Sequence, residues 1–392
     1  MKIAFLCTSG ADNASPRGRW LPVAAELAQL GHLPSVFLLH PAFDTASATE
    51  RTYDQRGVHI EHVAQMHVYG PPGAQRHFGG AALARVSAAA ALALYRAAMR
   101  AKPDAIHVCK PQPMNTLAGM LAARRLGVPL FVDCDDYEAE ANHFGSAWQK
   151  HVVRWWEDRA PLRAQGVTVN TRFLRDRCRA LGVDAARIAL VPNGLLLENF
   201  PVVPTQHDGR TVLYLGAMRI GSHGVNLLID AFARVHAQQP DARLLMVGDG
   251  PDRQKLEQQA HALGIETVTH WVGAVAHETV LSYYARATCS VDPVSDTPAM
   301  RGRSALKIVE SLACGVPVVT GDVGDRCNTL LAGTPSVCGE IVAPGDSQSL
   351  AEGILRLLRD HARRDVLASH ARQRAVDYDW RALAPAWAQL YA

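Results

Sequence analysis

Lys307 and Glu310 lie three residues apart in the segment SALKIVESLACGVPVVTGDVGDR, residues 304–326, and together they could bind an anionic ligand. Ser304 is a candidate helix N-cap, apolar residues recur after it at helical spacing, and the run CGVP is typical of a helix end. An i, i+3 pair shares one helix face, and a helix N-terminus attracts phosphate through its free N–H groups and its dipole. The pattern indicates a nucleotide-linked substrate, although an ordinary surface ion pair would have the same spacing.

Short apolar runs alternate with longer helical patterns along the chain, which is typical of parallel sheets connected by helices. The first half has predicted helices at 20–30 and 115–126, and predicted strands at 2–6, 35–39, 105–108, 130–132, 167–170 and 188–191. The second half has predicted strands at 211–215, 243–247, 268–271, 289–291, 316–320 and 339–342. The predicted fold class is α/β, with two Rossmann-like, doubly wound domains. Parallel sheets bind ligands beyond the carboxyl ends of their strands, so we expect the working cleft between these domains.

The length and the charge of the chain limit its function. With 392 residues and 48% hydrophobic content it can bury two cores, and a Pro/Gly-rich segment at 200–209 is the expected hinge. A net charge of +3 argues against a general nucleic-acid binder. The charge is uneven, because residues 1–203 hold 22 Lys and Arg against 17 Asp and Glu, and the remainder holds 18 against 20.

Basic residues and tryptophans gather in one stretch of the first half. Residues 150–187 hold nine Lys and Arg against four Asp and Glu, and Trp148, Trp155 and Trp156 lie beside them. Such a surface could contact an anionic membrane or an acidic acceptor. A solvated helical face with inward-packed tryptophans is the alternative.

The cysteines and the apolar segments indicate a cytoplasmic protein. The eight cysteines form no CxxC pair, so neither a zinc site nor a disulfide framework is suggested. The N-terminal apolar run is too short for a signal peptide and predicts a buried strand. Residues 81–101 are rich in alanine but contain three arginines, so they predict a packed helix and not a membrane span. Peripheral contact at the inner face of the membrane is left open.

Several segments carry a family resemblance in a fixed order. Four of them resemble the donor domain of family-4 glycosyltransferases, the retaining enzymes of the GT-B architecture, namely SALKIVESLACGVPVV, YLGAMRIGSHGVNLLIDAF (214–232), LLMVGDGPDRQKLE (244–257) and HWVGAVAHETVLSYYARATCSVDP (270–293). Two more resemble parts of the N-terminal domain, namely IHVCKPQP (106–113) and VPNGLLLENF (191–200). The pattern SxLKxxE is similar to particular branches of this family.

The resemblance implies two Rossmann-like domains that face a central cleft. Residues 1–203 would bind the acceptor, residues 204–375 would bind a nucleotide sugar, and a helix at 376–392 would cross back to the first domain. The implied reaction moves a sugar from a nucleotide-diphosphate donor, with a UDP-sugar favoured, to a hydroxyl group with retention of configuration. It needs no metal or other cofactor. The acceptor would be a glycan, a glycolipid or a small molecule, and the oligomeric state stays open.

The same resemblance assigns the donor-side residues. Lys307, and after it Arg219, would stabilise the negative charge that grows on the departing diphosphate. Glu310 matches the second glutamate of the paired-glutamate motif of the family and would bind the ribose hydroxyls. The other donor-side residues are Gly216, Gly248, Asp249, Val272, Arg303 and Ser304.

The chain departs from the family pattern at several positions. Gly302 stands where the first glutamate of the motif is expected, so the identity of the sugar cannot be inherited. Ala217 follows the first glycine of the phosphate loop, and the arginine comes two residues later. His223 stands where lysine is usual. Arg301 or Arg303 could supply the phosphate contact that these changes remove.

On the acceptor side the resemblance points to loops after the strands of the first domain. Arg17 and Arg19 follow the first strand and could bind an acidic acceptor or the donor phosphate. Lys110 follows Cys109, which occupies a position where many relatives carry histidine, so an acid–base role there is weakened. Asp135 and Asp136 would accept hydrogen bonds from acceptor hydroxyls, or cap a helix.

The run DCDDYE at 133–138 also suits a divalent cation, because paired carboxylates bind magnesium or manganese. The segments around it resemble a two-domain, metal-independent enzyme, so no metal site is predicted.

Two other functions would fit part of the pattern. A nucleotide-sugar epimerase can share this architecture and would convert the donor without an acceptor. A non-catalytic nucleotide-sugar or glycan-binding protein is the second alternative, because the first glutamate of the motif is missing. A Rossmann dehydrogenase is disfavoured, since no GxGxxG follows the first strand.

Overall fold

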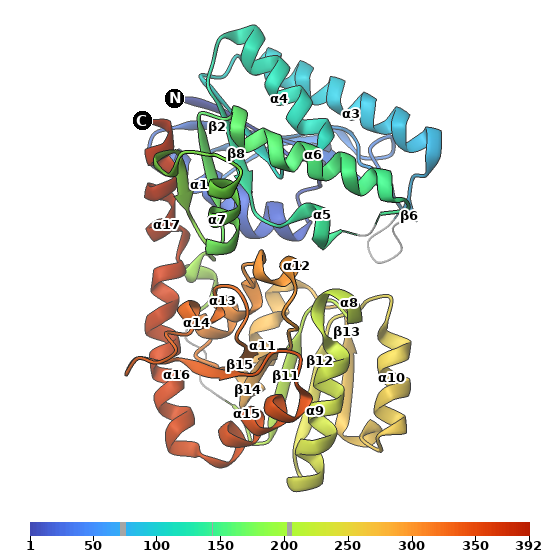
Figure 1. Ribbon diagram of the computed structural model, residues 1–392, viewed down its shortest axis with the longest axis vertical. Coiled ribbons are helices and arrows are strands. Elements are labelled where there is room, and N and C mark those ends of the chain that lie inside the picture. The colour runs from blue at the N-terminus through green and yellow to red at the C-terminus, as the bar shows by residue number, and fades with distance from the viewer. Residues whose placement is uncertain (71–75, 143, 202–205) are drawn as a thin grey trace. The chain divides into compact units, whose positions relative to one another are not determined.

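The computed structural model describes residues 1–70, 76–142, 144–201 and 206–392, which form two compact units (Figure 1). The first unit comprises Met1–Leu195, Gly302–Ser304 and Trp380–Ala392, and the second comprises Leu196–Arg301 and Ala305–Asp379. Part of the predicted hinge, residues 202–205, lies outside the described residues. Each unit is described by itself.

The first unit is built on an eight-stranded sheet in the order β10-β9-β8-β7-β1-β2-β4-β3, in which only the β3–β4 pair is antiparallel. Its strands are β1 (Lys2–Leu6), β2 (Leu33–His40), β3 (Thr52–Gln55), β4 (Val58–Gln65), β7 (Ala105–Cys109), β8 (Leu130–Cys134), β9 (Gly166–Val169) and β10 (Ile188–Leu190). A separate two-stranded sheet pairs β5 (Val68–Tyr69) with β6 (Arg76–His77). The six strands predicted for the first half are all present.

The sequence patterns did not predict β3 and β4, nor the two-residue strands β5 and β6. In β4 the buried residues Val58, Ile60, His62 and Ala64 alternate with half-buried residues, so its face toward the core includes a polar histidine. A parallel strand that is buried on both faces usually forms a continuous apolar run, and β4 has no such run. Its only sequence signal is the alternation of buried and half-buried residues, which is weaker.

Helices cover both faces of the first sheet. On one face α3 (Gly80–Ala101), α4 (Pro113–Leu126), α6 (Ala147–Arg163) and α7 (Arg172–Ala180) share one hydrophobic core with the strands. On the other face α1 (Leu21–Gln29) packs against β2 and α17 (Trp380–Ala388). Two short helices, α2 (Ala48–Arg51) and α5 (Glu138–Ala141), and a π-helical turn at Pro16–Trp20 complete the unit.

Among the described residues, α3 is the helix that is long and apolar enough to cross a membrane by length and composition. Ala90, Leu94, Ala97 and Ala98 of this helix are buried in the core of the first unit. This packing agrees with the interpretation of the segment as a packed helix.

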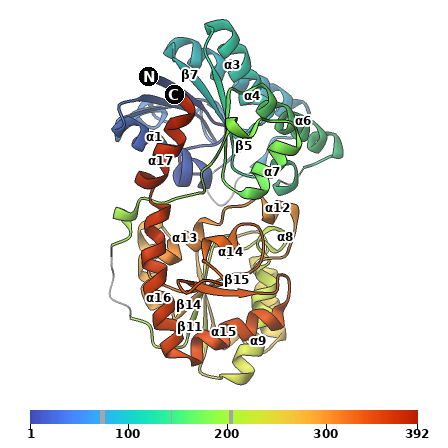
Figure 2. The ribbon, with the colours of Figure 1, turned by 60° about the vertical axis from the view of Figure 1, so that its left-hand side comes forward.

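The C-terminal segment belongs to the first unit, where α17 lies beside α1 (Figure 2). The backbone N–H of Trp380 donates to the carbonyl of Leu195 at 2.9 Å. Tyr391 Oη lies 2.8 Å from His107 Nδ1 of β7, and the Trp387 indole N–H donates to Tyr391 Oη at 3.1 Å. His107 also stacks on Phe5 of β1. An aromatic cluster therefore attaches the end of the chain to the sheet.

The second unit contains a six-stranded parallel sheet in the order β13-β12-β11-β14-β15-β16. Its strands are β11 (Thr211–Leu215), β12 (Arg243–Val247), β13 (Thr269–Gly273), β14 (Cys289–Asp292), β15 (Val318–Gly321) and β16 (Gly339–Val342). The helices are α8 (Ile220–His223), α9 (Val225–Gln238), α10 (Arg253–Ala262), α11 (Val280–Arg286), α12 (Pro298–Arg301), α13 (Leu306–Ala313), α14 (Arg326–Thr329), α15 (Ser347–Arg359) and α16 (His361–Ala375). All six predicted strands are present, and the predicted α/β fold with two Rossmann-like units is confirmed.

Acid should loosen the aromatic cluster, because burial lowers the pKa of His107 to about 4. The unfolded chain binds a proton at this histidine below about pH 6.5, whereas the folded chain resists protonation until about pH 4. This group therefore makes folding less favourable as pH falls from 6.5 to 4, by roughly 3 kcal/mol. His107→Phe should remove that part of the pH dependence. Urea unfolding at pH 7, 5 and 4 measures it, with exposed His261→Phe as control. Parallel pH profiles for wild type and His107→Phe would contradict the assignment.

Candidate active site

Two glycine loops interlock at the carboxyl end of the second sheet. Gly216 follows β11 and Gly248 follows β12. A Cβ at Gly248 would lie 2.0 Å from the carbonyl oxygen of Gly216, and one at Gly250 would lie 2.5 Å from that of Met218. The backbone N–H of Met218 donates to the carbonyl of Asp249 at 3.0 Å. These contacts fix both loops at the edge where ligands bind to parallel sheets, and only glycine leaves room for them.

Lys307, in the first turn of α13, reaches this edge. Its Nζ lies 3.3 Å from Asp292 Oδ1 and 4.7 Å from the centre of the Tyr214 ring. A Cβ at Gly216 would come within 3.3 Å of the same Nζ. The ammonium is thus held against a carboxylate and an aromatic face, with 18% of the side chain still exposed.

Asp292 is the buried anion that holds Lys307. It ends β14, and its Oδ2 accepts from Nε of the buried Arg326 at 2.8 Å and from the hydroxyl of Thr320 at 3.2 Å. Burial alone would raise the pKa of Asp292, but Arg326 and Lys307 hold it well below its usual range. Asp292 therefore stays ionised, and two cations share its charge.

Glu310 lies one turn after Lys307 on α13 and is buried. Glu310 lies near the hydroxyl of Tyr284, whose pKa is raised well above its ordinary value by burial and by the Glu310 carboxylate. The same hydroxyl donates to the carbonyl of Lys307 at 3.2 Å. Tyr284 thus connects the first turn of the helix to the glutamate.

The remaining donor-side residues have different surroundings. Arg219 and Asp249 are exposed on the interlocked loops, and Val272 is exposed at the end of β13. Arg301 is paired with Asp296 at 2.6 Å. Arg303 is half-buried in the first unit, with Nε 3.9 Å from Asp136 Oδ1.

The expectation that Ser304 caps helix α13 is wrong. The N-cap of α13 is Ala305, which makes no side-chain cap hydrogen bond. Ser304 instead belongs to the first unit, where its hydroxyl accepts from the backbone N–H of Asn193 at 3.1 Å. The Asn193 side-chain amide also donates to the Ser304 carbonyl at 3.0 Å. A contact with a residue 111 positions away has replaced the local cap.

Lys110 occupies the corresponding edge of the first sheet, directly after β7. Its φ is +57°, a conformation that side chains other than glycine seldom adopt. The side-chain amide of the buried Asn115 donates to the carbonyls of Leu6, Cys109 and Lys110, at 3.0, 2.6 and 2.9 Å. Asn115 thereby maintains the strained turn that directs Lys110.

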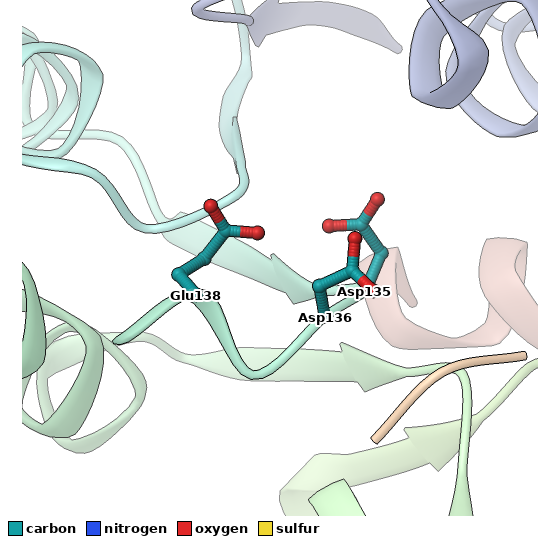
Figure 3. Close-up of side chains that lie close together, drawn as sticks. All are labelled: Asp135, Asp136 and Glu138. Carbon is teal, nitrogen blue, oxygen red and sulfur yellow. The ribbon is translucent and has the colours of Figure 1, made fainter. Parts of the chain in front are cut away.

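Lys110 lies among three carboxylates of the segment after β8. Its Nζ is 2.7 Å from Asp136, 2.9 Å from Glu138 and 3.7 Å from Asp135. Figure 3 shows the three carboxyl groups on the same side of this segment, and an oxygen of each lies within 4.8 Å of the others. Such a group could hold a metal ion, but here the lysine supplies a cation from the chain itself.

The charges of this cluster depend on burial. Burial alone would lower the pKa of Lys110, but the three carboxylates raise it well above its ordinary value. Burial raises the pKa of Asp135 well above its usual range, whereas Lys110 and Arg303 outweigh burial at Asp136 and lower its pKa. Of the two aspartates, Asp135 is thus the one that more readily keeps its proton.

Arg17 and Arg19, which were expected to act alike, have opposite surroundings. Arg17 is exposed. Arg19 is 1% exposed and pairs in bidentate fashion with the buried Asp133, at 2.8 and 2.7 Å. Its Nη1 donates to the carbonyl of Val191 at 2.8 Å, and its guanidinium lies 4.8 Å from the Trp387 ring. Arg19 is therefore a structural group that connects four segments, and Arg17 is the one that can meet a ligand.

Several residues that build the two edges were not predicted from the sequence. Asp292, Arg326 and Tyr284 surround Lys307, and Asn115 holds the turn at Lys110. A usable signal existed for Asp292, because an aspartate that ends a buried strand lies at the ligand-binding edge of a parallel sheet. The others come from distant segments, and no local pattern marks them.

Two family models together match most of the chain. Residues 17–194 match the family model of the glycosyl transferase 4-like domain, and residues 197–374 match that of the glycosyl transferases group 1. The chain belongs to the GT-B glycosyltransferases. The particular SxLKxxE branch stays a prediction.

Individual relatives of this chain are distant. It is 31% identical over 245 residues to the phosphatidyl-myo-inositol mannosyltransferase of Mycobacterium leprae. The aligned residues make up 61% of each of the two chains. The chain thus spans about three fifths of the length of the curated relatives that it matches. Its fold is similar to sucrose-phosphate synthase of Thermosynechococcus elongatus, with a TM-score of 0.78, 20% identity, and coverage of 100% of this chain and 98% of that one. HepE of Anabaena in complex with UDP-glucose gives a TM-score of 0.73, 21% identity, and coverage of 100% and 99%.

Removing the Arg19 guanidinium should destabilise the first unit. Arg19→Met leaves the Asp133 carboxylate buried without its cation, which we expect to cost about 3–5 kcal/mol of unfolding free energy. Chemical denaturation measures this loss. Arg17→Met is the matched control and should change stability by less than about 0.5 kcal/mol, because that side chain is exposed. Equal stability of the two variants would show that the buried pair is not structural.

Proposed function

We propose that this glycosyltransferase moves a sugar from a nucleotide-diphosphate donor to a hydroxyl group of an acceptor. The observation that carries the proposal is the Lys307 site of the second unit, where an ammonium group held by Asp292 lies beside two glycine loops. Such loops let a diphosphate approach the backbone closely, and the ammonium can balance its charge. Residues 204–375 would form the donor domain, residues 1–203 the acceptor domain, and 376–392 a helix returning to the acceptor domain.

In the proposed reaction Lys307 stabilises the leaving diphosphate. The bond between the anomeric carbon and the phosphate oxygen breaks, so negative charge grows on the phosphate while the acceptor oxygen bonds to that carbon. Lys307, assisted by Arg219, would offset this charge. The proton of the acceptor hydroxyl would go to the departing phosphate. Asp292 is a positioning residue in this scheme, since it fixes Lys307 without meeting the substrate.

Glu310 would bind the ribose hydroxyls of the donor, as an acceptor-only carboxylate can. The nucleotide and its phosphates would lie against Gly216, Gly248, Asp249 and Val272. Two residues that precede α13, Arg303 and Ser304, would add further contacts to the donor. The missing first glutamate, at Gly302, leaves the choice of sugar to other groups.

A UDP-sugar is the favoured donor, supported by the fold similarity to HepE of Anabaena, whose structure contains UDP-glucose. Transfer with retention of configuration and without a metal ion is part of the proposal. The lysine among the three carboxylates supports metal independence, because it already supplies a cation there. The acceptor, which would be a glycan, a glycolipid or a small molecule, would meet Arg17, Lys110, Asp135 and Asp136. The reaction would take place in the cytoplasm.

Donor binding tests the proposal directly. Thermal shift and mass spectrometry with UDP-, GDP- and ADP-sugars, each with EDTA and with added magnesium, should show stabilisation and slow donor hydrolysis by one nucleotide class in both conditions. Loss of binding or hydrolysis in EDTA would contradict metal independence. No shift with any nucleotide sugar would contradict the donor site. Isomerisation of the donor alone would favour an epimerase, and tight binding without turnover would favour a binding protein.

Lys307→Ala should lower turnover by at least about 100-fold while leaving the fold intact. One preorganised cationic or hydrogen-bonding contact to transition-state charge is typically worth that much, and Asp292 keeps Arg326 as its partner in the variant. Steady-state kinetics and circular dichroism measure the two effects. Lys255→Ala is the matched control, because Lys255 is exposed and paired only with Asp252 among the ion pairs described. Near-normal turnover by Lys307→Ala would overturn the assignment.

A further inference from the structure

The outer surface of the helix layer formed by α3, α4 and α6 has an unusual composition. The three helices lie side by side on one face of the first sheet, with α4 in contact with both neighbours (Figures 1 and 2). Their inner residues, such as Leu94, Ala118 and Ala160, belong to one hydrophobic core. The opposite face of the layer is exposed, and we call it the outer face.

Large apolar side chains lie exposed along α6 on this outer face. Trp148 is 65% exposed, Trp155 is 49% exposed, and Val152 and Leu162 are each 40% exposed. Their spacing of four, three and seven residues places them in one stripe of the helix. A soluble surface usually scatters such side chains singly, so a stripe with two tryptophans marks a contact surface.

The apolar stripe continues onto the neighbouring helices. Leu117 and Leu121 of α4 are 41% and 51% exposed, and Leu92 of α3 is 46% exposed. Many of the other exposed residues of α3 are alanines, for example Ala84 and Ala88. The outer face is therefore apolar over three adjacent helices and not along one helix alone.

The charges on the same helices are almost all positive. α3, α4 and α6 contain nine Lys and Arg but only two Asp and Glu. Of these two acids, Glu157 is buried and Asp158 is paired with Arg177. All arginines of α3 and α4 are exposed, as are Arg159 and Arg163 of α6. The outer face thus combines apolar side chains with exposed cations and has no unpaired exposed carboxylate of its own.

The tryptophans are presented in a defined geometry. The Arg159 guanidinium lies 4.8 Å from the centre of the Trp155 ring, and Trp156 packs edge-to-face on Trp155 at 4.9 Å. A supported indole next to an arginine suits the boundary between lipid headgroups and acyl chains, because indole is amphipathic and guanidinium binds phosphate.

From this composition we propose that the outer face of α3, α4 and α6 docks on an anionic phospholipid membrane. The arginines would pair with lipid phosphates, while Trp148, Trp155 and the exposed leucines enter the headgroup boundary. The proposal is independent of the sugar-transfer reaction, since none of these side chains lies at the Lys307 site or in the Lys110 cluster. Charge complementarity favours this occupant over a second copy of the chain, whose outer face would carry the same positive charge.

Vesicle co-sedimentation tests the proposal with the full chain. The wild-type protein should bind vesicles of mixed phosphatidylglycerol and phosphatidylcholine, and its affinity should fall as the salt concentration rises. It should bind vesicles of pure phosphatidylcholine at least tenfold less tightly. Tryptophan emission should shift to the blue on binding. Trp148→Ala with Trp155→Ala should lose at least tenfold in affinity, whereas Leu263→Ala with Val366→Ala, which removes two exposed apolar side chains of the second unit, should bind as wild type does.

A second pair of variants tests the electrostatic contribution of the arginines to vesicle binding. Arg124→Gln with Arg125→Gln should weaken binding to the anionic vesicles by roughly fivefold per arginine. Arg243→Gln with Arg286→Gln, which removes two exposed arginines of the second unit, is the charge-matched control. Circular dichroism and thermal unfolding check that each variant folds.

Three outcomes would overturn the proposal. One is the absence of vesicle binding by wild type. Another is equal loss of binding in the outer-face variants and their controls. The third is self-association in sedimentation velocity that the tryptophan substitutions abolish, without vesicle binding, which would assign the face to a second copy of the chain.

Discussion

A buried aspartate neutralised by a buried arginine organises the carboxyl edge of each sheet. In the first unit Asp133 pairs with Arg19, and in the second Asp292 pairs with Arg326. Each carboxylate lies near the end of a strand where loops must meet, and leaving it unpaired in the interior would cost several kcal/mol. The arginine therefore has to come from another segment, and its position fixes that segment. The geometry of both edges depends on this requirement.

The two pairs leave different groups available for chemistry. In the first unit Arg19 also binds the carbonyl of Val191 and packs on Trp387, so the pair connects the start of the chain, the sheet and the C-terminal helix. Lys110 and its three carboxylates form a second, largely buried cluster in the same unit. In the second unit Arg326 leaves Oδ1 of Asp292 to Lys307, which is partly exposed. One carboxylate thus holds a structural cation and a cation that can meet a substrate.

The proposed membrane-docking surface lies on the face of the first sheet that α3, α4 and α6 cover. The helices α1 and α17 cover the other face. The inner faces of α3, α4 and α6 pack in the hydrophobic core. Their outer faces do not contribute to that core, so folding does not require them to be apolar. An outer face that nevertheless keeps two exposed tryptophans and almost only positive charge needs an explanation other than folding. Because the aromatic cluster around His107 lies on the other face, contact through the helix layer would leave the C-terminal attachment undisturbed.

The sequence by itself determined the alternation of strands and helices, and with it two mainly parallel sheets whose carboxyl ends carry the candidate residues. It also placed Lys307 and Glu310 on one short helix, because helical spacing and turn residues act over only a few positions. The tertiary structure alone decided what holds them. Arg19 meets Asp133 across 114 residues, and Arg326 meets Asp292 across 34. Ser304 bonds to Asn193 and not to its own helix, and β4 carries a histidine on its buried face. These choices depend on which segments packing brings together, and no local period in the sequence records that.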